Sequence, residues 1–285
     1  MFSVRRSLLI TGISAILLLN GGCASTLADS MSNTLSTAIL NEDDPQLVRD
    51  GLPAYLLLID GLIIENPGSE GLLVAGAKLN GAYGSIFAND RARSIQMAKK
   101  AFDYAHRAMC ERDDELCAAE KTPFRQFKTH LVDLSESDVP VAYAYASAWA
   151  GVIQANSKDW RAVADIPKVE ALLERIIDLV PDYENGRPHL YLAVMRSQIP
   201  PSLGGRPEEG RKEFEAAISL SNGKDMMAKV MYAEYYARLV FNKDLHDQLL
   251  KEVINGDPVF PGLTLTNTLA QQRARELMKS GKDYF

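Results

Sequence analysis

The sequence predicts an all-α fold: a tetratricopeptide-like array of helical hairpins with a capping C-terminal helix. Two observations support this prediction. From Pro45 onward, apolar residues recur every three or four positions, and no run of alternating β-branched residues predicts a strand. A small, large, small pattern of packing residues also recurs along the chain, as in the second helix of tetratricopeptide hairpins.

The small, large, small pattern occurs five times. Its clearest copies are Ala98, Phe102, Ala105 and Gly210, Phe214, Ala217. Three looser copies each precede a proline by five residues: Tyr55, Ile59, Leu62 before Pro67; Val169, Leu173, Ile176 before Pro181; and His246, Leu250, Val253 before Pro258. Their starts differ by 43, 71, 41 and 36 residues, so the longest interval spans about two units of the ~34-residue repeat.

Candidate first helices of the hairpins lie between these copies. They span residues 69–87, 139–154, 187–197 and 224–241. The polar stretch 111–137 interrupts the order and is expected to be an insertion between units. A final helix over 266–280 is expected to cover the apolar face of the last repeat, because solenoids need a cap.

The first 22 residues have the pattern of a signal peptide. Two arginines precede an uncharged stretch over 7–19, shorter than the about 20 apolar residues of a membrane span. Cys23 follows two glycines and looks like the acylated cysteine of a bacterial lipobox, although Asn20 stands where leucine is usual. We therefore expect a lipid anchor at Cys23 in preference to an ordinary secreted protein.

Three segments follow from this reading of the N-terminus. Residues 1–22 are the expected signal, 23–44 a tether with a short helix over 31–40, and 45–285 the helical-repeat domain. Ala24 is not the aspartate that retains lipoproteins at the inner membrane, so we favour the outer membrane, with the domain in the periplasm.

Charge excludes nucleic acid as an expected partner. Removal of Arg5 and Arg6 with the signal leaves 29 basic against 37 acidic residues, a formal charge of −8 on a 263-residue mature chain. Nucleic-acid binding requires a concentrated basic surface that releases counterions. The length is sufficient for a substantial core in one or two domains.

Cys110 and Cys117 are seven residues apart, and an oxidising periplasm favours a disulfide between them if the backbone turns in the acidic stretch that separates them. The alternative is a metal site, because His106 lies one helical turn before Cys110. Structural zinc normally has four ligands at recognisable spacing, so the disulfide is the favoured interpretation and no metal is predicted. An enzymatic function would require this metal alternative.

Catalytic patterns are missing elsewhere in the sequence. The four histidines have no HExxH or paired-carboxylate context, and the chain has no nucleophile elbow, phosphate loop or Rossmann fingerprint. The glycine-rich stretch 202–214 places Glu208 and Glu209 where a phosphate would bind, so it is interpreted as a turn that begins a helix. We expect neither enzymatic activity nor a cofactor.

Aromatic residues on the first helices are candidates for a binding groove, because first helices line the concave face of such arrays. Aromatics at helical spacing are more often core, which is the competing interpretation. The candidates for a ligand or partner groove are Trp149, Tyr191, Tyr232 and Tyr236, with Arg196 as a possible anchor for a carboxylate.

Three long segments resemble a known family. They are "NPGSEGLLVAGAKLNGAYGSIF" (66–87), "WAGVIQANSKDWRAVADIPKVEALLERIIDLVPDYENG" (149–186) and "HLYLAVMRSQIPPSLGGRPEEGRKEFEAAISLSNGKDMMAKVMYAEYYARLVFNKDLHDQLLKEVI" (189–254). In order and spacing, especially at "PPSLGG" and "VMYAEYYA", they are similar to the TatT-type tetratricopeptide lipoproteins associated with TRAP transporters.

The resemblance implies an all-α lipoprotein that forms a ring-like trimer with a central pore. It also implies docking of a periplasmic TRAP substrate-binding protein and assistance in the uptake of a hydrophobic or organic-acid ligand. The family supplies no catalytic residues. The alternative function is a scaffold for envelope or outer-membrane protein assembly, which would hold extended peptides in its groove.

Overall fold

The computed structural model describes residues 34, 36–88, 90–198 and 201–285, and all regular elements in these ranges are helices. The N-terminal half contains α3 (Pro45–Glu65), α4 (Glu70–Ile86), α5 (Arg91–Arg112), α6 (Asp114–Ala119), α7 (Phe124–His130), η1 (Leu131–Asp133), η2 (Glu136–Asp138), α8 (Val139–Ala155) and α9 (Trp160–Val163). The C-terminal half contains α10 (Ile166–Leu179), η3 (Tyr183–Asn185), α11 (Arg187–Ser197), η4 (Pro201–Leu203), α12 (Pro207–Leu220), α13 (Met226–Met231), η5 (Tyr232–Ala237), α14 (Lys243–Asn255) and α15 (Thr264–Tyr284). The predicted all-α fold is confirmed.

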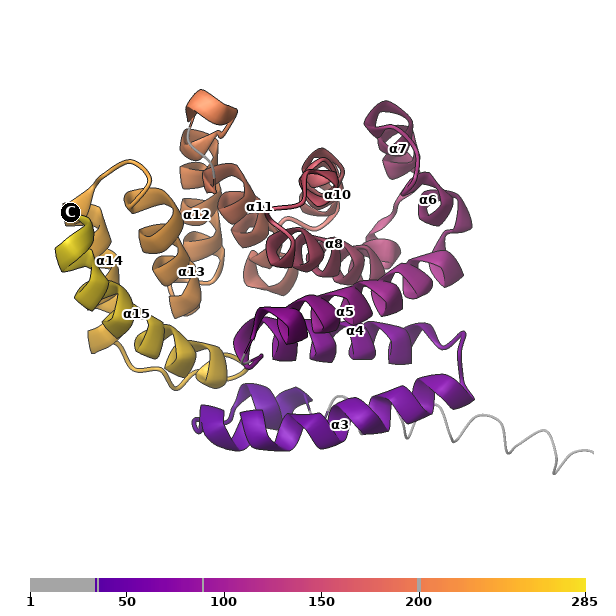
Figure 1. Cartoon of the computed structure of the whole chain (residues 1–285), viewed down its shortest axis with the longest axis horizontal. Coiled ribbons are helices and arrows are strands. Elements are labelled where there is room, and N and C mark those ends of the chain that lie inside the picture. The colour runs from indigo at the N-terminus through magenta and orange to yellow at the C-terminus, as the bar shows by residue number, and fades with distance from the viewer. Residues whose placement is uncertain (1–33, 35, 89, 199–200) are drawn as a thin grey trace, which may run out of the picture.

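Successive helices form hairpins that stack side by side, and the predicted repeat array is therefore present. The pairs are α4 with α5, α8 with α10, α11 with α12, and α13 and η5 with α14, each led by one of the predicted first helices. Figure 1 shows that the array curves, so that its yellow C-terminal helix returns toward the indigo N-terminal helix.

The C-terminal helix caps the array and also closes the curve. Helix α15 covers α13 and α14, as expected, and begins two residues before the predicted start at 266. Its Leu265 joins a small core with Val48, Leu52 and Leu56 of α3. The backbone N–H of Gly262 donates to the side-chain oxygen of Asn41 at 2.8 Å. The start of α15 therefore meets α3.

The repeat pattern marks the packing positions. Ala105, Phe214 and Leu173 are fully buried, and a methyl group on Gly210 would lie 2.9 Å from the carbonyl oxygen of Ala193, so a small residue is required there. Tyr55 differs, with 40% of its surface exposed. The reason is that α3 packs mainly on α4, which leaves its outer face in solvent.

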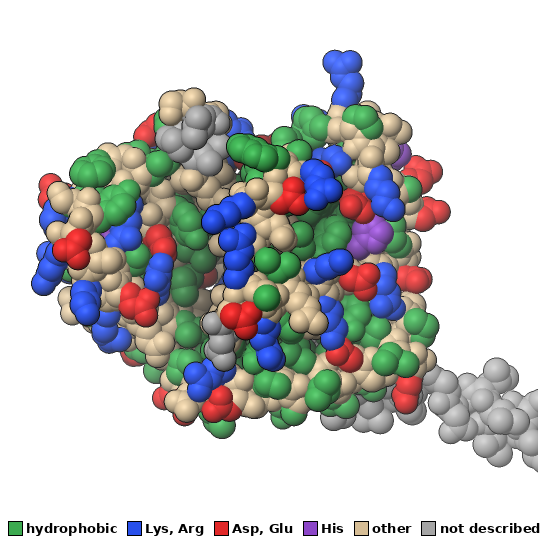
Figure 2. Space-filling view, in the orientation of Figure 1, with side chains coloured by type: hydrophobic (Ala, Val, Ile, Leu, Met, Phe, Trp, Pro, Cys, Tyr) green, Lys and Arg blue, Asp and Glu red, His purple; other side chains and the backbone are tan. Residues whose placement is uncertain are grey.

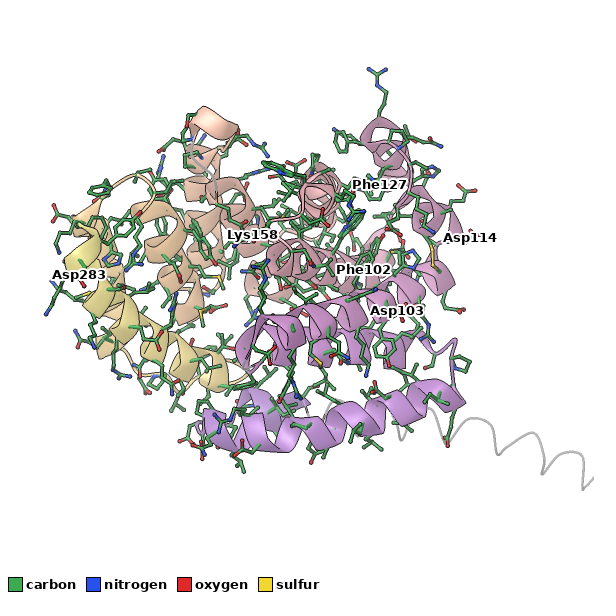
Figure 3. All side chains as sticks on the ribbon, viewed as in Figure 1. Phe102, Asp103, Asp114, Phe127, Lys158 and Asp283 are labelled. Atoms are coloured by element: carbon green, nitrogen blue, oxygen red, sulfur yellow. A yellow bond between two sulfur atoms is a disulfide. The ribbon has the colours of Figure 1, made fainter. Side chains whose placement is uncertain are left out.

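The insertion predicted over 111–137 forms α6, α7, η1 and η2, which stand outside the stacked hairpins (Figure 1). Asp113 ends α5 and begins α6: its side chain accepts a hydrogen bond from the backbone N–H of Leu116 at 2.9 Å. This turn brings Cys110 and Cys117 together, and the structure joins them by a disulfide with 4.9 Å between their Cα atoms. Figure 3 shows the bond beside Asp114.

The predicted signal over 1–22, the lipidation site Cys23 and most of the tether lie outside the described residues. Residues 36–40 are helical, within the short helix expected over 31–40. Among the described helices, none combines the length and the apolar character that a membrane crossing needs.

Candidate functional site

The inner cluster consists of tyrosines from α8, η3 and α11. The ring of Tyr143 on α8 lies 5.2 Å from that of Tyr183 in η3 and 6.0 Å from that of Tyr191 on α11, both edge to face. Lys78 of α4 lies 6.0 Å from the Tyr143 ring and pairs with Glu184 at 2.8 Å. The cluster therefore joins the first helices of three hairpins, α4, α8 and α11.

A strained turn positions one side of this cluster. Glu184, Asn185 and Gly186 follow one another with φ of 45°, 57° and 86°, a left-handed conformation that costs energy in the first two. Gly186 is also pressed against Leu220, which lies 3.0 Å from the position of an added methyl group. Strain held by surrounding packing is common at functional sites, and here it places Tyr183 next to the start of α11.

Arg187, at the first position of α11, is the cation of this cluster. Its guanidinium lies 3.7 Å from the carboxylate of Asp225, and one third of its side chain is accessible. Burial opposes its charge, but Asp225 and the neighbouring tyrosines and Glu184 raise its pKa. Arg187 thus remains charged and retains accessible surface, which lets it contact an anion.

Burial sets the protonation of the surrounding phenols. It raises the pKa of Tyr143 well above the usual 10, that of Tyr191 above 10, and that of Tyr183 to about 12. At neutral pH all three are therefore neutral hydroxyls that can donate hydrogen bonds. A cation with neutral donors and aromatic faces suits an organic anion with an apolar portion.

The surface is hollowed beside these elements. Figure 2 shows a depression between the C-terminal helices and the central helices, with hydrophobic side chains inside it. Lys158, labelled in Figure 3, stands close to the same boundary at the end of α8. Across it, Tyr235 of η5 interacts with Gln154 of α8, and burial raises its pKa.

The π-helical geometry of η5 is a local irregularity that sequence reasoning missed. It spans Tyr232–Ala237, within the family-like "VMYAEYYA" stretch. One extra residue per turn directs Tyr232 and Tyr236 to α12 and leaves Tyr235 toward α8, and such π segments are frequent at functional sites. Tyr232 stacks on Phe214 at 5.0 Å between ring centres.

The structure places the five groove candidates differently from one another. Trp149, 3% exposed, lies in the core against Phe127. Tyr236 and Tyr232 are buried, with hydroxyls that donate to Glu208 and Glu215 of α12. These three occupy packing positions, which is the competing interpretation of aromatics at helical spacing. Tyr191 is half-buried in the inner cluster and remains a groove candidate.

Arg196 is not available as a carboxylate anchor, because carboxylates of the chain itself occupy its donors. Its guanidinium donates to Glu213 at 2.7 Å and to Glu174 at 2.5 Å, with Glu209 at 3.7 Å. The side chain is 7% exposed. Arg187 at the other end of α11 has more accessible side-chain surface and a single, longer ion pair. The strained turn before it is the signal that could have found it, since "ENG" favours left-handed backbone.

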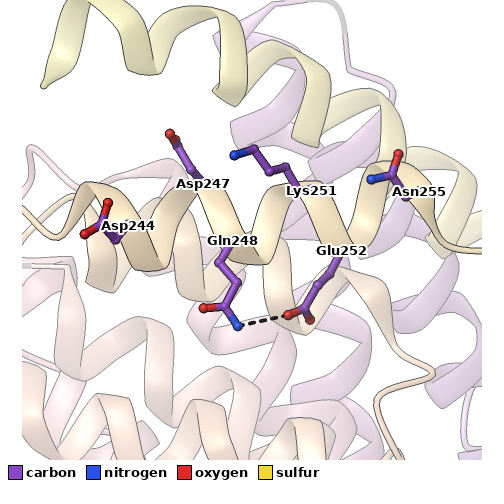
Figure 4. A pocket seen from close by; sticks show the side chains of 6 residues that line it. All are labelled: Asp244, Asp247, Gln248, Lys251, Glu252 and Asn255. Atoms are coloured by element: carbon purple, nitrogen blue, oxygen red, sulfur yellow. Dashed lines mark hydrogen bonds between the residues drawn. The ribbon is translucent and has the colours of Figure 1, made fainter.

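A shallow hollow runs along the outer side of α14. Asp244, Asp247, Gln248, Lys251, Glu252 and Asn255 line it, all from this one helix (Figure 4). The amide of Gln248 donates to Glu252 at 3.1 Å. Its lining is polar, with three carboxylates against one cation, Lys251, and it offers no aromatic surface comparable with that of the inner cluster.

An apolar face on α3 is the other notable surface. Leu47, Leu57, Leu58 and Ile64 are 51–79% exposed, and they share the outer face with Gly51, Ala54 and Gly61. A methyl group added to Gly51 or Gly61 would meet no atom within 4 Å. The face is therefore both apolar and flat, which is typical of a surface that binds another protein or a membrane.

Comparison with known proteins assigns the chain to a family. The family model described as TRAP transporter T-component matches residues 41–285, almost all of the described fold. The chain belongs to the TRAP transporter T-component family. It is also 23% identical over 262 residues to an uncharacterized protein of Treponema pallidum (strain Nichols), a match that covers 86% of this chain and 81% of that protein. A T-component is part of a transport system, so the role lies with TRAP transporters.

Proposed function

We propose that this protein is a lipid-anchored periplasmic T-component that binds the substrate-binding protein of a TRAP transporter and assists ligand uptake. The observation that carries the proposal is the family match over 41–285. Helical arrays of this kind offer long surfaces to folded partners. An anchor at Cys23 would confine the protein near the membrane, favouring the outer one, and raise the effective concentration for a weak encounter.

The ligand contacted during transfer is an organic anion, bound by the inner cluster. Arg187 supplies the positive charge, and the half-buried Tyr183 and Tyr191 supply hydroxyl donors and aromatic surface. Tyr143, 4% exposed, is buried against these two tyrosines. Asp225 partly offsets the charge of Arg187, but at 3.7 Å it is too far away to form a hydrogen bond with the guanidinium. A modest affinity is consistent with hand-over, since a conduit must release what it binds.

The protein acts as a homotrimer, and the outer face of α3 is its self-association surface. Gly51, Ala54 and Gly61 let a neighbouring helix approach closely, and Leu57 and Ile64 supply apolar area. Asp50 and Glu65 flank this face, and Arg49 pairs with Asp50. Asp60 pairs with Lys100, so the face has no excess of cations, which disfavours docking on an anionic lipid surface. A second copy of the chain is therefore the better occupant.

Capture from the envelope tests the partner. The acylated full-length protein is used to capture proteins from detergent-solubilised envelope, followed by mass spectrometry. A TRAP substrate-binding protein among the captured proteins supports the proposal. Capture of outer-membrane proteins or their assembly machinery, without that receptor, contradicts it and favours an envelope-assembly scaffold.

Light scattering tests the oligomer. The unacylated chain that lacks residues 1–23 is expected to have three times its monomer mass, and Leu57→Asp with Ile64→Asp is expected to convert it to a monomer with unchanged helicity. Trp160→Asp is the matched control, because Trp160 is 85% exposed on a different surface. A monomeric wild type, or a trimer that both α3 substitutions leave intact, contradicts this part of the proposal.

A further inference from the structure

Four metal-ligating side chains meet where α5 turns into α6. His106 and Cys110 lie one turn apart on α5, and the turn at Asp113 returns Cys117 to them. The donor atoms of these three residues lie within 4.8 Å of one another. Glu120, at the end of α6, adds a carboxylate oxygen 3.1 Å from Nε2 of His106. Sequence spacing had offered three ligands; the fold supplies a fourth.

The distances from His106 bracket those of a tetrahedral site. Nε2 lies 3.5 Å from the sulfur of Cys117, 4.0 Å from that of Cys110 and 3.1 Å from Glu120. With zinc bonds of about 2.3 Å to sulfur and about 2.0 Å to nitrogen or oxygen, neighbouring ligand atoms are separated by about 3.3–3.8 Å. Only the Cys117 distance lies in this range, and the Cys110 sulfur is nearer to Nδ1 of His106, at 3.6 Å, than to Nε2. Zinc binding therefore requires the two sulfurs to separate, the Cys110 side chain to move toward Nε2 and the Glu120 side chain to rotate.

The surroundings hold these ligands in place. The His106 ring packs between Phe102 and Tyr145, at 6.0 and 5.9 Å between ring centres. Lys168 donates to the backbone carbonyl of Glu120 at 2.6 Å and so fixes the end of α6. The side chains of His106 and Glu120 remain 27% and 21% accessible, which leaves a path for an ion.

We propose that the reduced form of this cluster binds one Zn²⁺ through His106, Cys110, Cys117 and Glu120, and that the disulfide is its metal-free form. A dithiol reductant transfers two electrons to the disulfide and becomes a disulfide itself, leaving two protein thiols. Zn²⁺ then displaces their two protons to solvent and binds both thiolates. Thiolates and imidazole favour zinc over calcium or magnesium, which prefer oxygen ligands.

Cobalt titration tests the site, because Co²⁺ reports its coordination in the visible spectrum. The chain lacking residues 1–23 is reduced with a phosphine, desalted without oxygen and titrated with Co²⁺. We expect one Co²⁺ per chain, the intense bands of four-coordinate cobalt, thiolate-to-cobalt charge transfer, and displacement by Zn²⁺. The oxidised protein is expected to show none of these. A pale six-coordinate spectrum from the reduced protein overturns the proposal.

Variants separate this site from adventitious binding. His106→Gln and Glu120→Gln are each expected to weaken Co²⁺ binding about tenfold or more. His130→Gln is the matched control, since His130 pairs with Glu115 at 3.8 Å outside the cluster. Unchanged affinity in either ligand variant contradicts the proposal. Circular dichroism is recorded in parallel: if reduction lowers helicity, Zn²⁺ must restore it, and failure to do so also overturns the site.

Discussion

The two ends of α11 carry the same residue type in opposite situations. Arg187 at the start of the helix retains a third of its side-chain surface and faces the tyrosine cluster. Arg196 near its end is 7% exposed and is surrounded by three carboxylates of neighbouring helices. One end is open to a ligand, whereas the other joins α10, α11 and α12 by charge.

The comparison shows that partners from distant segments of the chain decide whether an arginine is enclosed or accessible. Glu174 and Glu213 lie 22 and 17 residues from Arg196 in sequence, and helix packing alone brings them to it. Arg187 has one acidic neighbour at 3.7 Å, from the segment that precedes α13. The stability of the array should therefore depend on Arg196 and its ligand binding on Arg187.

The largest expected effect is on stability at Arg196. Arg196→Met should lower the free energy of unfolding by about 3 kcal/mol, because the buried guanidinium loses its charged hydrogen bonds to Glu213 and Glu174, and Glu213, 19% exposed, keeps only His189 as a partner. Arg187→Met should cost less, about 1–2 kcal/mol, because its pair with Asp225 is long at 3.7 Å and the buried Asp225 keeps a hydrogen bond from the backbone N–H of Met227. Urea denaturation followed by circular dichroism measures both. Equal losses in the two variants would remove the distinction between the ends of α11.

Helix packing next to Arg196 gives the second effect. Gly210→Ala should destabilise the protein by about 1–3 kcal/mol, because the new methyl group would meet Ser197 and the carbonyl of Ala193 at 2.9 Å. Gly151→Ala, in an open position of α8, should instead stabilise by about 0.5–1 kcal/mol through helix propensity. Thermal unfolding distinguishes the signs, and a neutral Gly210→Ala would mean that α11 and α12 are packed less closely than described.

The charge cluster predicts a pH dependence. Burial alone would raise the pKa of Glu213, but hydrogen bonding and charge from His189 and Arg196 outweigh it and lower that pKa. A carboxylate with a lowered pKa stabilises the fold above the unfolded value of about 4.3, and this contribution is lost as pH falls through the folded pKa.

Glu213→Gln should therefore cost about 2 kcal/mol at pH 7, and the difference from wild type should shrink below about pH 4. Denaturation across pH 3–7 checks this. Glu276→Gln, which removes an exposed pair with Arg273, serves as the control with almost no effect. A Glu213→Gln deficit that is constant with pH would show that the ion pairs do not hold this end of α11.

The smallest effect is expected in the tyrosine cluster. Tyr191→Phe removes one hydroxyl donor and should weaken binding of an anionic ligand by about fivefold, the equivalent of one hydrogen bond of about 1 kcal/mol. Octanoate is the probe, measured by calorimetry. Tyr55→Phe on the outer face of α3 should leave octanoate binding unchanged. Equal affinities for wild type and Tyr191→Phe would place the ligand elsewhere.

Sequence periodicity predicts the helical hairpins well, because buried positions such as Phe214 and Leu250 recur at spacings that local geometry imposes. It also predicts the capping helix and the insertion. It does not predict which aromatics are accessible. Trp149 is covered by Phe127 of the insertion, and the π-helical geometry of η5 sets the directions of Tyr232 and Tyr236. Nor does it show that Arg196 is neutralised, because that depends on pairs made across helices.

Ring closure is the other feature beyond sequence reasoning. The contact of Leu265 with α3 joins residues about 210 positions apart, and the sequence pattern of neither helix predicts it. Closure leaves the opposite face of α3 exposed. The proposed self-association surface thus depends on a contact that only the folded chain reveals.

The central claim is that Arg187 is the cation that a ligand contacts. Calorimetric titration of wild type and Arg187→Met with octanoate, and with octanol as the uncharged counterpart, tests it most directly. We predict that wild type binds octanoate more tightly than octanol, and that Arg187→Met loses at least about tenfold in octanoate affinity while octanol binding is retained. Octanoate binding that Arg187→Met leaves unchanged would contradict the account.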